Sequence, residues 1–274
     1  MNSFVCLYYP GSGSSWLLVM LGSVPSVWVP GYEPIESWHW EAEQSEKRVW
    51  LQSLIQGSPG GAGENDEAWL SRLRASPQAT EPVRTGFTTV GIKMTPDAII
   101  DHDWLVDVLD DADTDLVFLV RNNRLKHALS LYRSYEEQKN QFQFEGIMPA
   151  TEIDLPVFDT WLETARGWHE RSMTLRDRCM EQLGGDRVLT VAYEDFADDA
   201  GKPGVIRASC DFLGLDPSRP IEAAELAASG GEPFGPDGYY RKATSDRVSD
   251  AVSNYADLRD HYHGSDIEAD FLEA

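Results

Sequence analysis

The first stretch of the chain that could perform chemistry is a turn built almost wholly of glycine and serine. Within FVCLYYPGSGSSWLL (residues 4–18), one apolar run ends at Pro10 and a second begins after the turn. The residues of interest are Gly11, Ser12, Gly13, Ser14, Ser15 and Trp16. Such a turn between a strand and a helix presents backbone N–H groups and hydroxyls at the helix N-terminus, which attracts phosphate without a charged side chain. The pattern also fits a tight connection whose serines only cap the helix.

The turn lacks the lysine of an ordinary nucleotide-binding loop. The GxxxxGK[ST] loop of P-loop NTPases carries a lysine before its serine or threonine, whereas here Trp16 follows the serines. No clear carboxylate that could bind Mg²⁺ follows a predicted strand either. Both observations disfavour a phosphotransferase of the P-loop type.

A second candidate anion site follows the apolar run DLVFLV at residues 115–120. Arg121 comes directly after this run, and Ser130 lies nine residues further on in a helical segment. Arginine offers a planar donor fork that matches phosphate, and serine adds a hydroxyl. The other basic residues of this helix are expected to face solvent on its polar side: Arg124, Lys126 and Arg133.

Residues 9–17 (YPGSGSSWL) resemble the 5′-phosphosulfate loop of sulfotransferases, enzymes that use the donor 3′-phosphoadenosine-5′-phosphosulfate (PAPS). The resemblance implies a donor site in which the serines and glycines bind the 5′-phosphosulfate and the tryptophan lies near the adenine: Gly11, Ser12, Gly13, Ser14, Ser15 and Trp16. Gly11 stands where the family has a lysine or arginine, which helps to neutralise the charge that develops during transfer. Lys93, at the end of the predicted strand TTVGIKM, is a candidate to replace that cation.

Two further stretches resemble the same family in the same order along the chain. Residues 116–134 resemble its 3′-phosphate motif, which implies that Arg121 and Ser130 hold the 3′-phosphate. The spacing of this motif is most similar to the bacterial trehalose sulfotransferase-like branch. Residues 188–216 resemble the family's Tyr-Glu-Asp segment, which implies that Tyr193 contacts the adenine.

A last stretch of resemblance lies near the C-terminus. Residues 238–258 are similar to a segment that closes over the 3′-phosphate, and Arg241 and Lys242 match two of its positions. The resemblance implies that both cations bind the donor. A solvated basic pair is the alternative interpretation.

Transfer to a hydroxyl also requires a base beside the turn. Sulfuryl transfer depends mainly on positioning, on stabilisation of charge and on removal of the hydroxyl proton. The stretch GYEPIESWHW (residues 31–40) offers Glu33, Glu36 and His39. In carbohydrate-type and trehalose-type relatives a glutamate in a similar context is the proposed base, and Glu36 is preferred here to Glu33. His39 lies between two tryptophans and fits a structural histidine, a base or a sugar-contacting group.

Short apolar runs and helical segments alternate along the chain. The predicted strands cover residues 4–9, 26–29, 88–94, 115–120 and 187–193. Helices are predicted over residues 14–23, 44–56 and 65–74, from Pro96, from about Asn123, and over residues 158–183, 205–215 and 246–262. This order predicts a single α/β domain over residues 1–274, a P-loop-like three-layer sandwich with a central parallel sheet flanked by helices. Ligands of such folds bind at the carboxyl ends of the strands.

The composition restricts the partners and the compartment. The 274 residues include 46 Asp and Glu against 23 Lys and Arg, a formal net charge of −23, which argues against binding to nucleic acid or to an anionic membrane. The three cysteines lie far apart in apolar surroundings and neither they nor the histidines show metal-ligand spacing, so no metal is expected. Without a basic leader or an apolar run of about 20 residues, a cytoplasmic protein is predicted.

These observations predict a PAPS-dependent sulfotransferase that acts on a hydroxyl of a sugar or small molecule. The alternative is a catalytically impaired homologue that binds PAPS, or its desulfated product adenosine 3′,5′-bisphosphate (PAP), without turnover. A P-loop-type phosphotransferase is the third hypothesis. The acceptor and the oligomeric state do not follow from the sequence.

Overall fold

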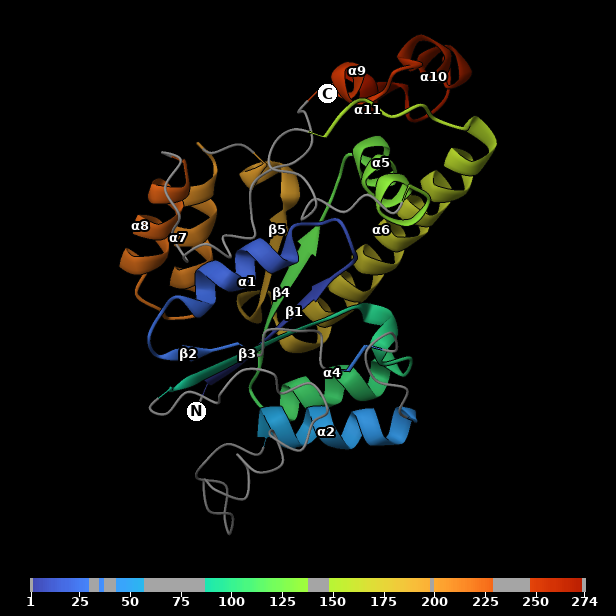
Figure 1. The fold of residues 1–274 in the computed structure, drawn as a ribbon. Helices are drawn as coiled ribbons and strands as arrows, with labels where there is room; N and C mark the ends of the chain where they lie inside the picture. The colour runs from blue at the N-terminus through green and yellow to red at the C-terminus, as the bar shows by residue number, and fades with distance from the viewer. Residues whose placement is uncertain are drawn as a thin grey trace.

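The computed structural model describes residues 2–29, 35–36, 43–56, 87–137, 148–197, 200–228 and 247–272. Within these residues a five-stranded parallel sheet has the order β2-β3-β1-β4-β5 (Figure 1). The strands are β1 Asn2–Tyr8, β2 Val27–Trp28, β3 Thr89–Met94, β4 Asp115–Val120 and β5 Val188–Ala192. Each of the five corresponds to a predicted strand, so the predicted parallel sheet is confirmed.

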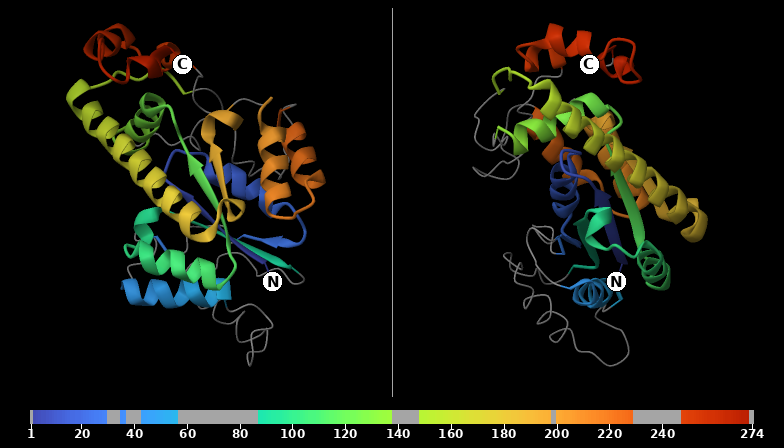
Figure 2. Two further views of the ribbon diagram at one scale, coloured as in Figure 1. Left: turned by 180° about the vertical axis from the view of Figure 1, so that it is seen from behind. Right: turned by 90° about the vertical axis from the view of Figure 1, so that its right-hand side faces the viewer.

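Helices cover both faces of this sheet, as predicted for a three-layer sandwich (Figures 1 and 2). One face packs against α1 Ser14–Gly22, α7 Lys202–Phe212 and α8 Ser218–Ala228. The other face packs against α2 Gln44–Gln56, α4 His102–Asp111 and part of α6 Leu155–Leu183. Alternate side chains of β1 enter the two cores, Cys6 on the α1 side and Val5 and Leu7 on the α4 side, because successive residues of a strand point to opposite faces.

A third apolar core lies at the carboxyl end of the sheet. It joins α5 Arg124–Tyr135 and the first turns of α6 to three short C-terminal helices, α9 Val248–Ala251, α10 Tyr255–His261 and α11 Glu268–Leu272. In Figure 1 these helices gather where the β4 arrow points. The C-terminal segment therefore packs beside the edge where ligands of α/β folds bind.

The structure corrects the prediction that Arg133 faces solvent. Only 1% of Arg133 is exposed, and its Nη2 donates to the carbonyl oxygens of Pro149 at 3.1 Å and of Ala251 at 2.5 Å. A buried guanidinium needs such acceptors because an unpaired charge in the interior is costly. Arg133 thus ties α5 to the C-terminal helices instead of lying on a polar face.

Two helix predictions differ from the structure, and one observed helix was not predicted. Pro96 opens a single 3₁₀ turn, η1 Pro96–Ala98, and α4 begins only at His102, where the carboxylate of Asp101 accepts from the N–H of Trp104. The predicted helix over residues 246–262 is interrupted at Val252, which is extended and pairs with Thr151. Helix α8 was not predicted, and the predicted helix over residues 65–74 lies outside the described residues.

The described ranges contain neither a membrane-spanning helix nor a cluster of metal ligands. No helix there is long and apolar enough to cross a membrane. In the same part of the chain, no group of three or more His, Cys, Asp or Glu side chains could hold a metal ion. The three cysteines are buried and unpaired: Cys6, Cys179 and Cys210.

Candidate functional site

The Gly/Ser turn joins the carboxyl end of β1 to the N-terminus of α1 and depends on two glycines with positive φ. Gly11 has φ 83° and Gly13 has φ 80°, in the left-handed region that glycine adopts without strain. Gly13 is the N-cap of α1 and has no side chain with which to cap the helix. The alternative in which the serines merely cap this helix is therefore not what the structure shows, because Ser14 and Ser15 lie inside its first turn.

Two buried donors beside the turn have no hydrogen-bond partner among the described residues. One is the hydroxyl of Ser12, a residue that is 1% exposed, and the other is Nε of Arg121. Buried polar groups are almost always paired, so unpaired ones require an explanation such as a ligand. An anion bound at the N-terminus of α1 would provide acceptors for both groups, and in this respect the residues fit the phosphates of the predicted donor.

Arg121, at the carboxyl end of β4, contacts the turn directly. Its Nη1 donates to the carbonyl oxygen of Gly11 at 2.7 Å, and its guanidinium carbon lies 4.3 Å from the ring centroid of Tyr193. Burial lowers the pKa of Arg121, while the nearby Tyr193 and Glu194 oppose that shift. The guanidinium is charged at every physiological pH and supplies a positive charge within an acidic protein.

Helix α5 contributes two more side chains to the same place. A Cβ atom added to Gly11 would lie 3.1 Å from Oγ of Ser130, so Ser130 is adjacent to the turn. Nε2 of His127 donates to the carbonyl oxygen of Pro10 at 2.7 Å. Burial, assisted by the charge of Arg121, lowers the pKa of His127 to about 3, so this imidazole is neutral at physiological pH and acts as a fixed donor. His127 was not predicted, although it lies one helical turn before Ser130.

Lys93 approaches the turn from the opposite side. It lies on β3 opposite Cys6 of β1, it is 6% exposed, and its Nζ donates to Oγ of Ser15 at 2.8 Å. The ammonium also lies 5.1 Å from the ring centroid of Tyr8. Cys6 itself is not a nucleophile, because burial raises the pKa of its thiol to about 12. The helix N-terminus thus has a buried cation on each side, Arg121 and Lys93.

Aromatic rings pack against the same turn. Trp16 stacks on Phe196 with centroids 5.0 Å apart, and Phe196 in turn meets the edge of Tyr193 at 5.4 Å. Nζ of Lys202 lies 5.8 Å from the Trp16 centroid. Trp16 and Tyr193, the two residues predicted to contact adenine, are therefore linked through Phe196 on the α1 side of the sheet.

Glu36 lies at the carboxyl end of β3. Oε1 accepts from the backbone N–H of Thr95, and Oε2 accepts from the Thr95 hydroxyl at 3.0 Å. The residue is 1% exposed. Its charge raises the pKa of Lys47 on α2, against a larger lowering by burial. Glu36 is consequently held by Thr95, which follows Lys93 by two residues in the chain, and each of its carboxylate oxygens accepts a hydrogen bond.

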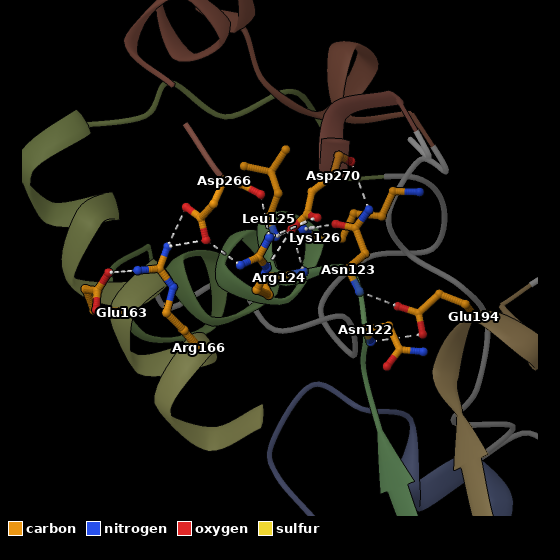
Figure 3. A network of polar contacts seen from close by, with 10 residues as sticks. All are labelled: Asn122, Asn123, Arg124, Leu125, Lys126, Glu163, Arg166, Glu194, Asp266 and Asp270. Atoms are coloured by element: carbon orange, nitrogen blue, oxygen red, sulfur yellow. Dashed lines mark hydrogen bonds and ion pairs between the residues drawn. The ribbon is translucent and has the colours of Figure 1, made fainter. Parts of the chain in front are cut away.

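Four predicted site residues lie outside the described residues: Glu33, His39, Arg241 and Lys242. The structure does describe Glu194, which sequence reasoning treated only as part of a motif. Its carboxylate accepts from the backbone N–H groups of Asn122 at 3.1 Å and Asn123 at 2.9 Å, immediately after Arg121 (Figure 3). The approach to the N-terminus of α5 is thus occupied by a carboxylate of the protein, whereas no side chain of the described residues caps the N-terminus of α1.

The turn leads to a prediction about stability. We expect Gly13→Ala to lower the free energy of unfolding by about 2–4 kcal/mol, since a positive φ is strained for alanine and the new Cβ would overlap a ring. That Cβ would lie 2.8 Å from Cε2 of Phe196. Urea denaturation measures the change, with Gly204→Ala in α7 as the matched control.

Gly204 has no atom within 4 Å of an added Cβ. Its replacement should stabilise the protein by roughly 0.5–1 kcal/mol because glycine is costly inside a helix. Equal effects of the two substitutions would contradict the conformation described for the turn.

Comparison with known proteins agrees with the resemblance seen in the motifs. A model described as "Sulfotransferase family" matches residues 7–219, which is most of the chain. No curated protein matches. The general family description gives no support to the narrower trehalose sulfotransferase-like branch.

Three solved structures illustrate the likeness in three dimensions. A sulfotransferase from Alicyclobacillus acidocaldarius aligns with TM-score 0.46 and 15% identity over 100% of this chain and 94% of its own. Mouse sulfotransferase SULT7A1, complexed with PAP, aligns with TM-score 0.46 and 15% identity over 99% of this chain and 88% of its own. The sulfotransferase domain of the Synechococcus PCC 7002 olefin synthase aligns with TM-score 0.46 and 18% identity over 99% of this chain and 92% of its own.

Proposed function

The chain belongs to the sulfotransferase family, and from this premise we propose that it transfers the sulfuryl group of PAPS to a hydroxyl group of a sugar or other small molecule. The observation that carries the proposal is the N-terminus of α1, where Gly13 offers no side-chain cap and where the hydroxyl of Ser12 and Nε of Arg121 have no hydrogen-bond partner in the described part of the chain. A site with these donors suits a ligand that carries two separate anionic groups.

Each part of the donor has candidate residues in this chain. The backbone N–H groups of the turn would hold the 5′-phosphosulfate together with Ser12, Ser14 and Ser15. Arg121 and Ser130 would hold the 3′-phosphate, with Arg241 and Lys242 as further ligands. Trp16 and Tyr193 would bind the adenine. When bound, PAPS supplies an activated sulfuryl group, and the proposal requires no metal.

Lys93 takes the role of the cation that is absent at Gly11. Charge develops on the leaving oxygen as the sulfuryl group departs, and a cation already in place stabilises that charge more than it stabilises the ground state. The contact of Lys93 with Ser15 supports this role because Ser15 belongs to the first turn of α1. A side chain at Gly11 would instead meet Ser130 and require a strained φ.

Glu36 is the preferred base and removes the proton of the acceptor hydroxyl. The bonds from Thr95 stabilise its carboxylate form and fix the orientation of the carboxylate at the carboxyl end of β3. Glutamine can keep this arrangement, with Oε1 facing the Thr95 N–H and its amide facing the Thr95 hydroxyl oxygen. Glu36→Gln should therefore preserve the fold and remove only the base.

We expect Glu36→Gln to lower kcat by about 100-fold to 10,000-fold, the usual contribution of a general base, with little effect on donor binding. Glu33→Gln and His39→Gln serve as matched comparisons from the same loop. If Glu33→Gln or His39→Gln alone abolishes turnover, that residue replaces Glu36 as the base. Full activity of all three variants would end the proposal that this loop supplies the base.

The first test of the function is calorimetric titration of PAPS and PAP into the purified protein. Binding in the micromolar range, with much weaker binding of AMP and ATP, is the expected result. Failure to bind either ligand would overturn the proposal and mean that the fold serves another purpose. Tight binding of both without turnover in an acceptor screen would instead favour an impaired homologue, the hypothesis that Gly11 suggests.

The spacing of nine between Arg121 and Ser130 is the feature that suggests a trehalose-type acceptor. A screen should therefore include disaccharides beside phenols and alcohols, with formation of PAP as the readout.

A further inference from the structure

We infer that Asp270, on the C-terminal helix α11, is a positioning residue for the phosphate-binding Arg121. The side chains of Asp270 and Glu194 together form a carboxylate clamp on the residues that follow Arg121. The inference deepens the proposed function and rests on it, because it concerns the binding of the 3′-phosphate.

The clamp binds four successive backbone N–H groups. Glu194 accepts those of residues 122 and 123, and Oδ2 of Asp270 accepts those of Arg124 at 3.0 Å and Leu125 at 3.4 Å (Figure 3). Oδ2 of Asp270 also accepts from Nε of Arg124 at 3.2 Å. The side-chain amide of Asn123 donates from Nδ2 to the carbonyl oxygen of Asp270 at 2.9 Å. The backbone that begins one residue after Arg121 is therefore held by two elements distant in sequence.

The first physical consequence concerns where an anion can bind. A helix N-terminus attracts anions through its free N–H groups, and at α5 the protein's own carboxylates take those groups. A phosphate is left with the side chains of Arg121 and Ser130 on this side of the site. The clamp thereby favours binding by side chains of fixed geometry over loose binding at the helix end.

The second consequence concerns the orientation of Arg121. Its side chain is held by the carbonyl of Gly11 and by the ring of Tyr193, and Glu194 immediately follows Tyr193 in the chain. The clamp thus fixes both the backbone next to Arg121 and the ring on which its guanidinium lies. A guanidinium fork loses most of its advantage over a simple charge when its orientation is free.

Helix α11 is anchored well enough to serve this purpose. Ile267 and Phe271 are buried in the third core, and Asp270 is 8% exposed. Asp266 adds ion pairs to Arg124 at 2.8 Å and Arg166 at 3.0 Å, but its side chain is 62% exposed and such pairs contribute little. The buried Asp270 is therefore the member of this helix expected to matter for binding.

The test compares Asp270→Ala with the conservative Asp270→Asn and with Asp260→Ala, an exposed aspartate of α10. Titration measures the affinities for PAP and for AMP, which lacks the 3′-phosphate. We expect Asp270→Ala to lower the ratio of the two affinities by roughly fivefold to tenfold, the size of one lost helix cap. Asparagine retains an acceptor oxygen and should restore most of the ratio, while Asp260→Ala should leave it unchanged.

Hydrogen exchange separates a positioning role from a merely structural one. Amides of residues 122–125 should exchange faster in Asp270→Ala, whereas amides of β1 should not. Faster exchange with an unchanged affinity ratio would overturn the inference, and so would an equal loss of PAP and AMP binding. If the unaltered protein binds no PAP, the proposed function itself fails, which is a different result from an unchanged ratio in the variant.

Discussion

Replacement of Arg121 by alanine is expected to weaken PAP binding by roughly 30-fold to 1,000-fold, because a buried charged partner of the ligand is removed. Arg121 is 9% exposed, and its Nε has no hydrogen-bond partner within the described ranges. AMP should bind with nearly unchanged affinity because it lacks the 3′-phosphate. The ratio of the two affinities, measured by calorimetry, is the decisive quantity.

Two controls make this result interpretable. Arg121→Lys keeps the charge but loses the planar fork, so an intermediate affinity is expected. Arg207→Ala, on the exposed side of α7, should behave as the unaltered protein. Because Arg121 also bonds Gly11, thermal unfolding of each variant must show that the turn and its surroundings persist. Unchanged PAP binding by a folded Arg121→Ala protein would refute the assignment of the 3′-phosphate site.

Replacement of Lys93 by methionine is expected to lower kcat by about 100-fold to 1,000-fold, the loss usually found when one stabilising group of a transition state is removed. Methionine has a similar length and suits the buried position beside Tyr8. The affinity for PAP should change only a few-fold, because PAP lacks the sulfuryl group near which Lys93 is proposed to act. Turnover is followed as formation of PAP in the presence of an acceptor found in the screen.

The matched control for Lys93 is Lys126→Met on α5, which removes a partly exposed lysine from a helix beside the site. Its kcat should stay within about twofold of the unaltered protein, as for most surface substitutions. Equal kcat values for Lys93→Met and the unaltered protein would show that Gly11 is not compensated by Lys93. The chain would then need another cation, or it would be the impaired homologue that Gly11 suggests.

Both predictions concern local cations in a strongly acidic protein. With a net charge of −23, the overall field repels a ligand that carries several negative charges. Affinity must come from groups held close to the ligand, where little water screens them. Arg121 and Lys93 meet this condition because both are buried beside the N-terminus of one helix.

Much of the architecture was evident in the sequence for local reasons. The five strands are short apolar runs covered on both faces, and such runs remain recognisable without knowledge of their neighbours. The Gly/Ser turn and Arg121 were recognised as candidate anion sites because each directly follows a predicted strand. The carboxyl ends of parallel strands meet at one edge of a sheet. The contact between Arg121 and Gly11 agrees with that expectation.

Other features depend on which distant segments pack together. Arg133 resembles a solvent-facing arginine in its helix, but the C-terminal helices bury it. In the sequence, nothing distinguishes Asp270 from the other acidic residues of the chain. In the structure it accepts a hydrogen bond from the N–H of Arg124 at the start of α5, across a sequence separation of 146 residues. No periodicity or spacing within a segment can encode a partner that comes from another part of the chain.

The sequence by itself determined the alternation of strands and helices, the Gly/Ser turn between β1 and α1 and the arginine directly after β4, because each rests on residues within one helical turn or one strand. The tertiary structure alone decided that Gly13 rather than a serine occupies the N-cap position of α1, that Lys93 reaches Ser15, and that carboxylates occupy the start of α5. These facts depend on the register between strands and on the packing of remote helices, which set distances of a few ångströms that local patterns leave open.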